Sequence, residues 1–314
     1  MDGRLENIVA RIVHYLQKVP IPGTHISLYN VLVVLWKKII TFDIDQRAAA
    51  VSFSLILAVF PGIIFIFTLI PYLPIDNLDE LILEFLRNIL PKGIYQAVAN
   101  TITDIISRKR VDVLSFGFFF TVFAATNGMM ALMRAFNMAL KKRDKRSYLK
   151  ARGVGLLLTA LLVFTLIFAV AIIIVGQIFL GYLLSKNVIG EDINLFIIQI
   201  LRYISVFAIF FIGICCIYYF APAIRKKLKF FSVGAGIASI LCILATNLFS
   251  YYLVNFNSYN RLYGSIGTFI GVMVWIYLIS LILIFGFEVN ISVRDAISED
   301  KTAKTPQQSS ARGV

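Results

Sequence analysis

Residues 263 to 293 read YGSIGTFIGVMVWIYLISLILIFGFEVNISV, a run in which Glu288 is the one charged side chain. A membrane core about 30 Å thick needs about 20 helical residues, so this run is long enough to cross it. Its length suits a helix better than the roughly ten-residue alternating strands of a barrel, because a helix satisfies its own backbone hydrogen bonds in lipid. The stretch therefore predicts a transmembrane helix.

Five further runs of this kind precede it, at residues 48–72, 113–140, 153–185, 193–220 and 230–254. Their only charged side chains are Arg134 and Arg202. Hydrophobic residues make up 59% of the chain and charged residues 15%, which separates it from soluble domains. The sequence therefore predicts an all-α integral membrane protein, with a bundle of six transmembrane helices at residues 48–293.

Lysine and arginine are distributed unevenly between the connecting segments. Residues 1–47, 141–152, 221–229 and 294–314 carry 21 of them, and the alternate connectors carry 7. Because basic connectors stay in the cytoplasm, both termini are expected there. The formal charge of +13 is then explained by basic residues that set the membrane topology and contact anionic lipid headgroups. We therefore expect no nucleic-acid partner.

Three segments outside the spans have patterns of their own. Residues 1–47 repeat apolar positions at helical spacing among basic ones, which predicts interfacial amphipathic helices on the cytoplasmic side. Residues 73–111 hold two apolar stripes separated by Pro91, which predicts an external helical hairpin. Residues 294–314 are mostly polar and are expected to form a disordered cytoplasmic tail.

Several stretches of the chain resemble one known family. They are AAAVSFSLILAVFPGIIFIF (48–67), NGMMALMRAFNMAL (127–140), YYFAPAIRKK (218–227), NFNSYNRLYGSIGTFIGVMVWIYL (255–278) and GFEVN (286–290). In order and spacing they are similar to the YihY/BrkB family of bacterial inner-membrane proteins. The resemblance implies a multi-pass protein of the bacterial cytoplasmic membrane with six helices. It implies no settled activity, because members have been called virulence factors, ribonucleases and transporters.

The residues themselves argue against the ribonuclease label. Metal-assisted hydrolysis of a phosphodiester needs His, Asp or Glu ligands close together, and the only histidines are His14 and His25, on either side of a Pro and Gly break. Without them no Ser-His-Asp or Cys-His arrangement can form, and no glycine-rich phosphate loop follows a strand. We therefore expect that the chain is no enzyme and has no cofactor and no metal site.

The charged residues inside the spans point to an internal site, since a charge in hydrocarbon costs roughly 2.5 to 3.5 kcal/mol on insertion scales. Arg134 and Glu288 each lie roughly 10 Å inside the expected cytoplasmic boundary, which predicts an ion pair between the second and sixth spans. Asn137 and Asn290 are the expected hydrogen-bonding neighbours, and Asn127 lies on the same polar face as Arg134. The pair would either lock two spans together or act as a gate on the cytoplasmic side.

Two other places are candidates for moving parts. Pro61 and Gly62 are a candidate helix break: they should kink or weaken the first span midway, because proline removes a backbone hydrogen bond. Transporters use such breaks to line a binding site, although proline also occurs in ordinary membrane helices. The external connector before the sixth span is either a rigid interfacial hairpin or a substrate-facing gate. Its candidate residues are Asn255, Asn257, Tyr259, Asn260, Tyr263 and Gly264.

Two classes of function remain open. Buried charges and basic membrane faces favour a transporter or a translocator of lipids or other amphiphiles without its own ATPase, because no nucleotide-binding motif is present; export of small ions or solutes is a variant. The other class is a structural or partner-binding envelope protein, acting as a homo-oligomer or with another protein. A continuous polar groove would favour the first class. An exposed stripe of small residues on the second span would favour the other: Gly117, Thr121, Ala124, Gly128, Ala131 and Ala135.

Overall fold

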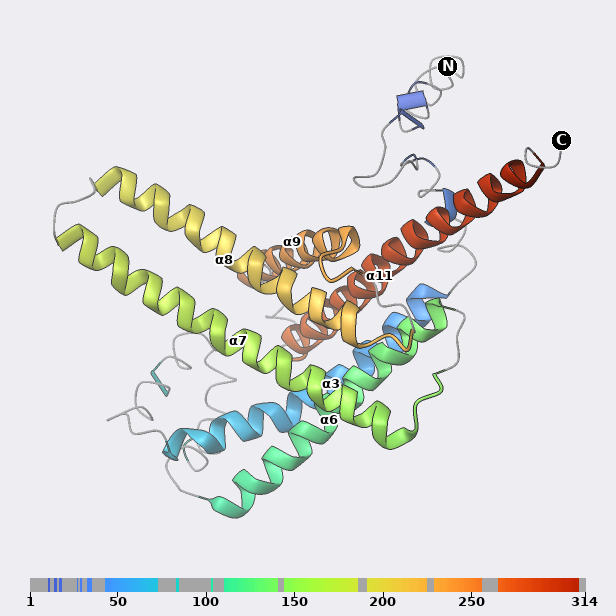
Figure 1. Ribbon diagram of the computed structural model, residues 1–314. Helices are drawn as coiled ribbons and strands as arrows, with labels where there is room; N and C mark the ends of the chain where they lie inside the picture. Colours follow the sequence, from blue (N-terminus) through green and yellow to red (C-terminus); the bar gives the residue numbers. More distant parts are fainter. Residues whose placement is uncertain are drawn as a thin grey trace.

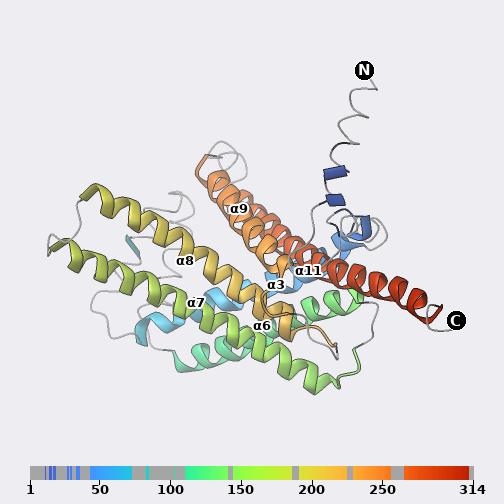
Figure 2. The ribbon, with the colours of Figure 1, turned by 45° about the horizontal axis from the view of Figure 1, so that its top comes forward.

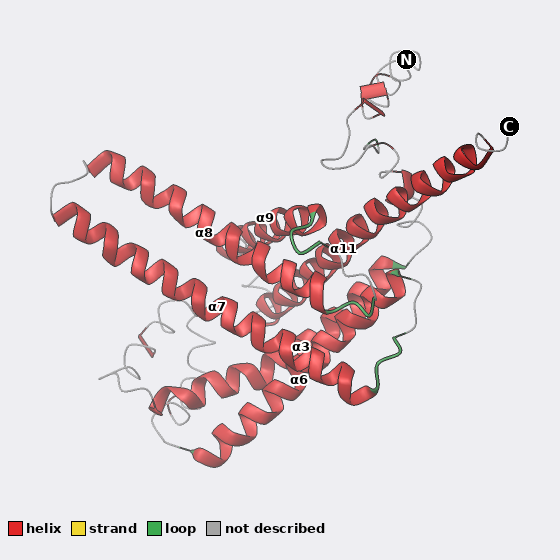
Figure 3. Cartoon of the chain, in the orientation of Figure 1, coloured by secondary structure: helices red, strands yellow, loops and turns green. Residues whose placement is uncertain are grey.

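The structure is a computed structural model that describes residues 43–72, 110–140, 144–185, 191–224, 229–255 and 265–310, with a few isolated positions elsewhere. In this part of the chain the architecture is helical and contains no sheet, as expected (Figure 3). Six helices each contain a stretch long and apolar enough to cross a membrane. They are α3 (Ile44–Leu69), α6 (Val111–Ala139), α7 (Tyr148–Ser185), α8 (Glu191–Phe220), α9 (Val233–Asn255) and α11 (Ser265–Ser310).

The six helices form a ring of neighbours. Each packs mainly against the next along the chain, so that α3 contacts α6, α6 contacts α7, α7 contacts α8, α8 contacts α9 and α9 contacts α11. The ring closes where α11 packs along α3, the last described helix against the first of the six (Figures 1 and 2). We call this contact between α3 and α11 the seam. No short connector joins these two helices, so contacts between their side chains hold the seam.

The interface between α3 and α6 is made by the small residues of α6. Gly117, Ala124, Gly128, Ala131 and Ala135 are buried. A Cβ added to Gly117 would lie 3.6 Å from the Cα of Phe65, and one added to Gly128 would press on Leu55. Small side chains allow two membrane helices to approach closely. The small-residue stripe is therefore covered by α3 and is not an exposed surface.

Helices α9 and α11 approach each other closely at a pair of glycines. Gly234 and Gly286 face one another there, and a Cβ on Gly286 would come 2.7 Å from the Gly234 carbonyl oxygen and 2.8 Å from the Cβ of Ala238. A Cβ on Gly234 would collide with the Gly286 carbonyl oxygen. Only glycine fits at both positions, so these two residues set the distance between the helices.

Helices α3 and α11 both continue past positions at which the sequence suggested a change. Helix α3 runs through Pro61 and Gly62 as one helix, so these residues do not divide it into two. Gly62 packs beside Thr121 of α6, and this contact supports α3 where proline has removed a backbone donor. Helix α11 continues to Ser310, so the segment predicted to be disordered from residue 294 is helical that far. Each further helical residue adds a hydrogen bond, and a formed helix extends easily.

The remaining expectations about the flanks concern segments outside the described residues. Only isolated positions are described before residue 43 and between residues 73 and 109, which covers the predicted interfacial helices and the external hairpin. Helix α6 begins at Val111, at the end of that expected hairpin. The placement of both termini in the cytoplasm stays a prediction.

Candidate functional site

The most deeply buried charges of the described residues meet at the seam. Arg47, in the first turn of α3, donates from Nη2 to Oε1 of Glu288 on α11 at 2.9 Å. Its Nη1 donates to the Ala135 carbonyl oxygen of α6 at 3.1 Å. The Arg47 side chain is 5% exposed and that of Glu288 is 0% exposed. One guanidinium therefore joins three helices, α3, α6 and α11.

The predicted partner of Glu288 was wrong. Glu288 pairs with Arg47, whereas Arg134 is exposed. The reason is the rotation of α6, which turns Ala131 and Ala135 toward α3 and thereby directs the neighbouring Arg134 outward. The sequence did not single out Arg47 as a partner of Glu288. Arg47 immediately precedes the apolar run that begins at residue 48, so it resembles the basic residues that set the membrane topology. An arginine at the very edge of a span, whose long side chain can reach about one turn inward, was the signal that could have identified it.

One oxygen of the ion pair has no hydrogen-bond partner among the described residues. Oε2 of Glu288 is buried without a hydrogen bond to any described residue, and so is Oγ of Ser292. Ser292 lies four residues further along α11 and is 0% exposed. Residues four apart lie on the same face of a helix, one turn above the other. The seam therefore contains two adjacent buried polar atoms with unused bonding capacity, which is uncommon in a folded protein.

An aromatic cluster lies directly beside the ion pair. Phe136 of α6 stacks on Phe287 of α11 with ring centroids 4.1 Å apart and an interplanar angle of 18°. Tyr218 of α8 contacts both rings edge-on at 5.6 Å. Its hydroxyl donates to the Leu283 carbonyl oxygen at 2.7 Å. The cluster excludes water, so the neighbouring charges interact in a medium of low dielectric.

Asn137 and Asn290 do not join the ion pair as expected. Asn137 donates from Nδ2 to Asp144 at 3.0 Å and accepts the Ala223 backbone N–H at 2.8 Å. Asn290 accepts the Gly234 backbone N–H at 2.8 Å and donates to Ser232 Oγ at 2.9 Å. Short polar side chains are well suited to bonding backbone groups that a helix end leaves free. The two asparagines therefore fasten the ends of helices to neighbouring segments.

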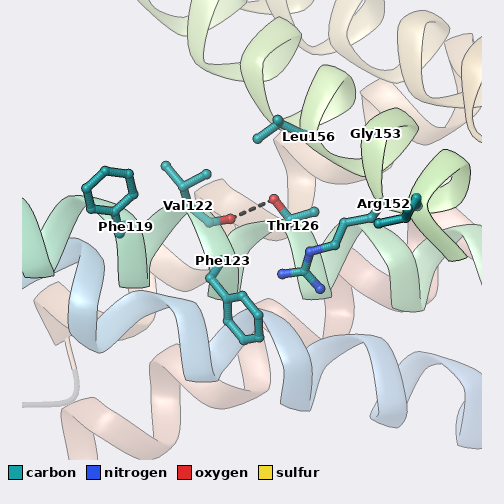
Figure 4. A pocket seen from close by; sticks show the side chains of 8 residues that line it. Phe119, Val122, Phe123, Thr126, Arg152, Gly153 and Leu156 are labelled. Carbon is teal, nitrogen blue, oxygen red and sulfur yellow. Dashed lines mark hydrogen bonds between the residues drawn. The ribbon is translucent and has the colours of Figure 1, made fainter.

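Asn127 takes part in a second group of polar contacts, between α6 and α7. Its Oδ1 accepts a hydrogen bond from Arg152 Nη1 at 3.1 Å, and the same nitrogen donates to the Tyr148 hydroxyl at 3.0 Å. The guanidinium carbon lies 4.2 Å from the centroid of the Phe123 ring. An open pocket of about 360 Å³ lies beside these groups (Figure 4). Its lining residues are Phe119, Val122, Phe123, Thr126, Leu149, Arg152, Gly153 and Leu156.

The candidate external gate lies almost wholly outside the described residues. Asn257, Tyr259, Asn260, Tyr263 and Gly264 fall between residues 256 and 264, which are not described. Asn255 is the last residue of α9. The role of this connector stays a prediction. Among the described residues, no three His, Cys, Asp or Glu side chains come together as metal ligands would.

Comparison with known proteins supports the assignment that the motifs suggested. A family model described as virulence factor BrkB matches residues 35–311. The chain belongs to the BrkB family. No solved structure matches it.

Two relatives resemble this chain over most of its length. A ribonuclease-like protein of Bacillus subtilis, YfkH, is 30% identical over 246 residues, which are 78% of this chain and 88% of the relative. A UPF0761 membrane protein of Haemophilus influenzae is 25% identical over 276 residues, 87% of this chain and 98% of the relative. The BrkB-family chain described here is a membrane protein with six helices of spanning length.

The stretch GFEVN of this BrkB-family chain can now be explained residue by residue. Gly286 permits the approach of α9, Phe287 stacks on Phe136, Glu288 pairs with Arg47 and Asn290 holds the start of α9. These four contacts reach helices α3, α6 and α9 from about one turn of α11. The stretch is one place at which α11 is fixed to several helices at once.

Proposed function

We propose that this BrkB-family chain is a transporter or translocator of an amphiphilic, lipid-like anion in the bacterial inner membrane, without an ATPase of its own, and that the Arg47–Glu288 pair is its gate. The observation that carries the proposal is the half-satisfied ion pair: one carboxylate oxygen of Glu288 is bonded to Arg47 and the other is buried without a partner among the described residues.

An ion pair that only stabilised the contact between two helices would not need a carboxylate oxygen without a partner. Removing two charges from water is costly, and packed hydrophobic residues of similar volume often hold an interface as well or better. A buried pair that serves stability is normally bonded on all of its oxygens and donors. Unused capacity at Glu288 Oε2 and Ser292 Oγ instead supports a contact that is exchanged for another during function.

The position of the Arg47–Glu288 pair in the fold also supports its role as a gate. It lies at the seam, where helices from opposite ends of the described chain meet without a short connector. Separating α3 from α11 would leave the contacts between successive helices in place, and it would also part α6 from α11 at the Phe136–Phe287 stack. The basic connectors at residues 141–147 and 225–229 give the protein a surface that attracts anionic headgroups, which suits an anionic cargo.

The alternative of a partner-binding envelope protein receives less support. Its expected surface was the stripe of small residues on α6, and α3 covers that stripe. Export of small ions or solutes would use the same gate, and the experiment below distinguishes it from lipid movement.

The test is a flux assay on purified protein in liposomes with three probes: a labelled anionic lipid, a labelled zwitterionic lipid and a small organic anion. The informative variant is the double substitution Arg47→Met with Glu288→Leu, because it removes both charges together and leaves neither unpaired. We expect wild type to move the anionic lipid, and the folded double variant to move it at a rate changed at least about tenfold.

Three results would contradict parts of the proposal. If the double variant moved the anionic lipid at the wild-type rate, the Arg47–Glu288 pair would have a structural role and would not be a gate. Movement of the small anion alone would favour the solute exporter. Folded wild-type protein that moves none of the three probes would remove transport and leave the envelope protein as the better account.

A further inference from the structure

We infer that the pocket beside Arg152 binds a phospholipid from the side of the bundle, with the lipid phosphate on the Arg152 guanidinium and one acyl chain along the apolar wall between α6 and α7. This inference concerns binding, and it stands or falls independently of the proposed transport. The name Arg152 pocket is used below for the eight lining residues given above.

The first argument is the charge of Arg152. Among the described residues its partners are the Asn127 amide oxygen, the Tyr148 hydroxyl and the face of the Phe123 ring, and none of these carries a negative charge. Both hydrogen bonds come from Nη1. Nε and Nη2 have no hydrogen-bond partner among the described residues. These donors are arranged as a planar fork, which is the geometry that phosphate oxygens accept.

The second argument is that the guanidinium is held in advance of binding. Two hydrogen bonds and a cation–π contact fix its position, so that little side-chain freedom remains to be lost when an anion arrives. A long side chain on an ordinary lipid-facing surface would move freely. The Arg152 pocket therefore differs from the general lipid contact that every membrane helix makes.

The third argument is the order of polar and apolar groups along the pocket. Arg152 lies four residues after the start of α7, beside the basic connector that contains Lys145 and Arg146, which places it at headgroup level. Leu156 lies one turn further along α7, and on α6 the wall continues from Thr126 to Val122 and Phe119. Figure 4 shows Arg152 at one end of this row and Phe119 at the other.

This order matches the chemistry of a phospholipid. An anionic phosphate at Arg152 would be followed by hydrocarbon against the leucine, valine and phenylalanine side chains. The cavity of about 360 Å³ falls within the range of ligand pockets, about 300 to 1,000 Å³. Free phosphate would use Arg152 but would gain nothing from the apolar wall.

The experiment measures retained lipid by native mass spectrometry of the full chain, extracted into a mild detergent with added phosphatidic acid. Arg152→Gln removes the charge, and Arg134→Gln is the matched control, because Arg134 is an exposed arginine about as far from the connector that joins α6 to α7. Gly153→Leu fills the pocket, since a Cβ at Gly153 meets no atom within 4 Å and the fold need not adjust.

We expect Arg152→Gln and Gly153→Leu each to weaken phosphatidic acid retention at least about tenfold, as the loss of a charged hydrogen bond or of the acyl-chain site would. Arg134→Gln should retain the lipid as wild type does, and inorganic phosphate at millimolar concentration should not displace it. Equal losses from Arg152→Gln and Arg134→Gln would overturn the inference in favour of general surface attraction. Displacement by phosphate, or an unaffected Gly153→Leu variant, would show that the acyl chain is not bound.

Discussion

Phe136 and Phe287 stack face to face at 4.1 Å, and the residues next to them in sequence, Ala135 and Glu288, are the two that bind Arg47. The stack and the ion pair are thus the apolar and polar halves of one contact between α6 and α11. Any change that moves one ring moves a ligand of the guanidinium.

Phe287→Leu should therefore lower the thermal stability of the protein in detergent. Loss of the aromatic contacts costs about 0.5 to 1.5 kcal/mol beyond the change in buried area, and the smaller side chain adds a cavity. Phe53→Leu is the control, because Phe53 is 62% exposed and lies in neither the stack nor the Arg152 pocket. The melting temperature, followed by size-exclusion chromatography after heating, should fall only for Phe287→Leu. Equal melting temperatures would mean that the stack adds nothing.

Arg47→Gln should destabilise the protein strongly, by about 3 to 5 kcal/mol, because it leaves Glu288 buried without its counter-charge. Arg134→Gln should change stability by less than about 0.5 kcal/mol, as an exposed substitution does. The same chemical change at two arginines thus separates the observed partner of Glu288 from the one expected from sequence. A larger loss at Arg134 than at Arg47 would restore the original hypothesis.

Ser292→Ala should stabilise the protein by about 1 kcal/mol or leave it unchanged, because it removes a buried hydroxyl that has no bond among the described residues. Ser239→Ala is the comparison, since that hydroxyl is equally buried but donates to the Ala235 carbonyl oxygen at 2.7 Å. The two variants are compared by their melting temperatures. A Ser292→Ala variant less stable than Ser239→Ala would show that the Ser292 hydroxyl is bonded in solution.

Gly286→Ala should impair folding, because the added Cβ would lie 2.7 Å from the Gly234 carbonyl oxygen and α9 would have to move away. Gly153→Ala is the control: its Cβ meets nothing within 4 Å, and alanine favours the helix by up to about 1 kcal/mol. The yield of monodisperse protein should drop for Gly286→Ala and hold or rise for Gly153→Ala. Similar yields would mean that α9 shifts without cost.

Asn137→Ala should loosen the connectors at the end of α6, because both Asp144 and the Ala223 backbone N–H lose a partner. Each lost bond is worth about 0.5 to 1.5 kcal/mol. Limited proteolysis after residue 225, in the basic connector, should become faster. Met138→Ala is the neighbouring control, since Met138 is 61% exposed. Unchanged cleavage in Asn137→Ala would show that other contacts hold the connector.

The helices and their order could be predicted from sequence because apolar run length is a local property. Most predicted ends differ from the observed ones by a few residues, as at α8, expected at 193–220 and observed at Glu191–Phe220. The far end of α11 was not predicted. The polar composition of residues 294–314 is typical of a disordered segment, whereas in the structure the helix continues to Ser310. Glu288 was recognised as special from its isolation in a long apolar run.

The partner of Glu288 could not be predicted, because pairing depends on how each helix is rotated and on which helices become neighbours. Matching depth along the membrane favoured Arg134, and the rotation of α6, which buries Ala131 and Ala135 and leaves Arg134 exposed, rules it out. The roles of Asn137 and Asn290 depend on connectors distant in sequence. Arg152 was counted as one basic residue of a loop, although it belongs to the first turns of α7.

The seam also determines the order in which the protein can be completed during its synthesis. The ribosome produces α3 first of the six helices and α11 last, so Arg47 enters the membrane region some 240 residues before Glu288 exists to neutralise it; their separation is 241 positions. An unpaired arginine at mid-membrane would be difficult to keep there for that time. At the first turn of α3 its long side chain is close enough to the end of the helix to reach the headgroups, and we expect it to enter the bundle when the last helix arrives.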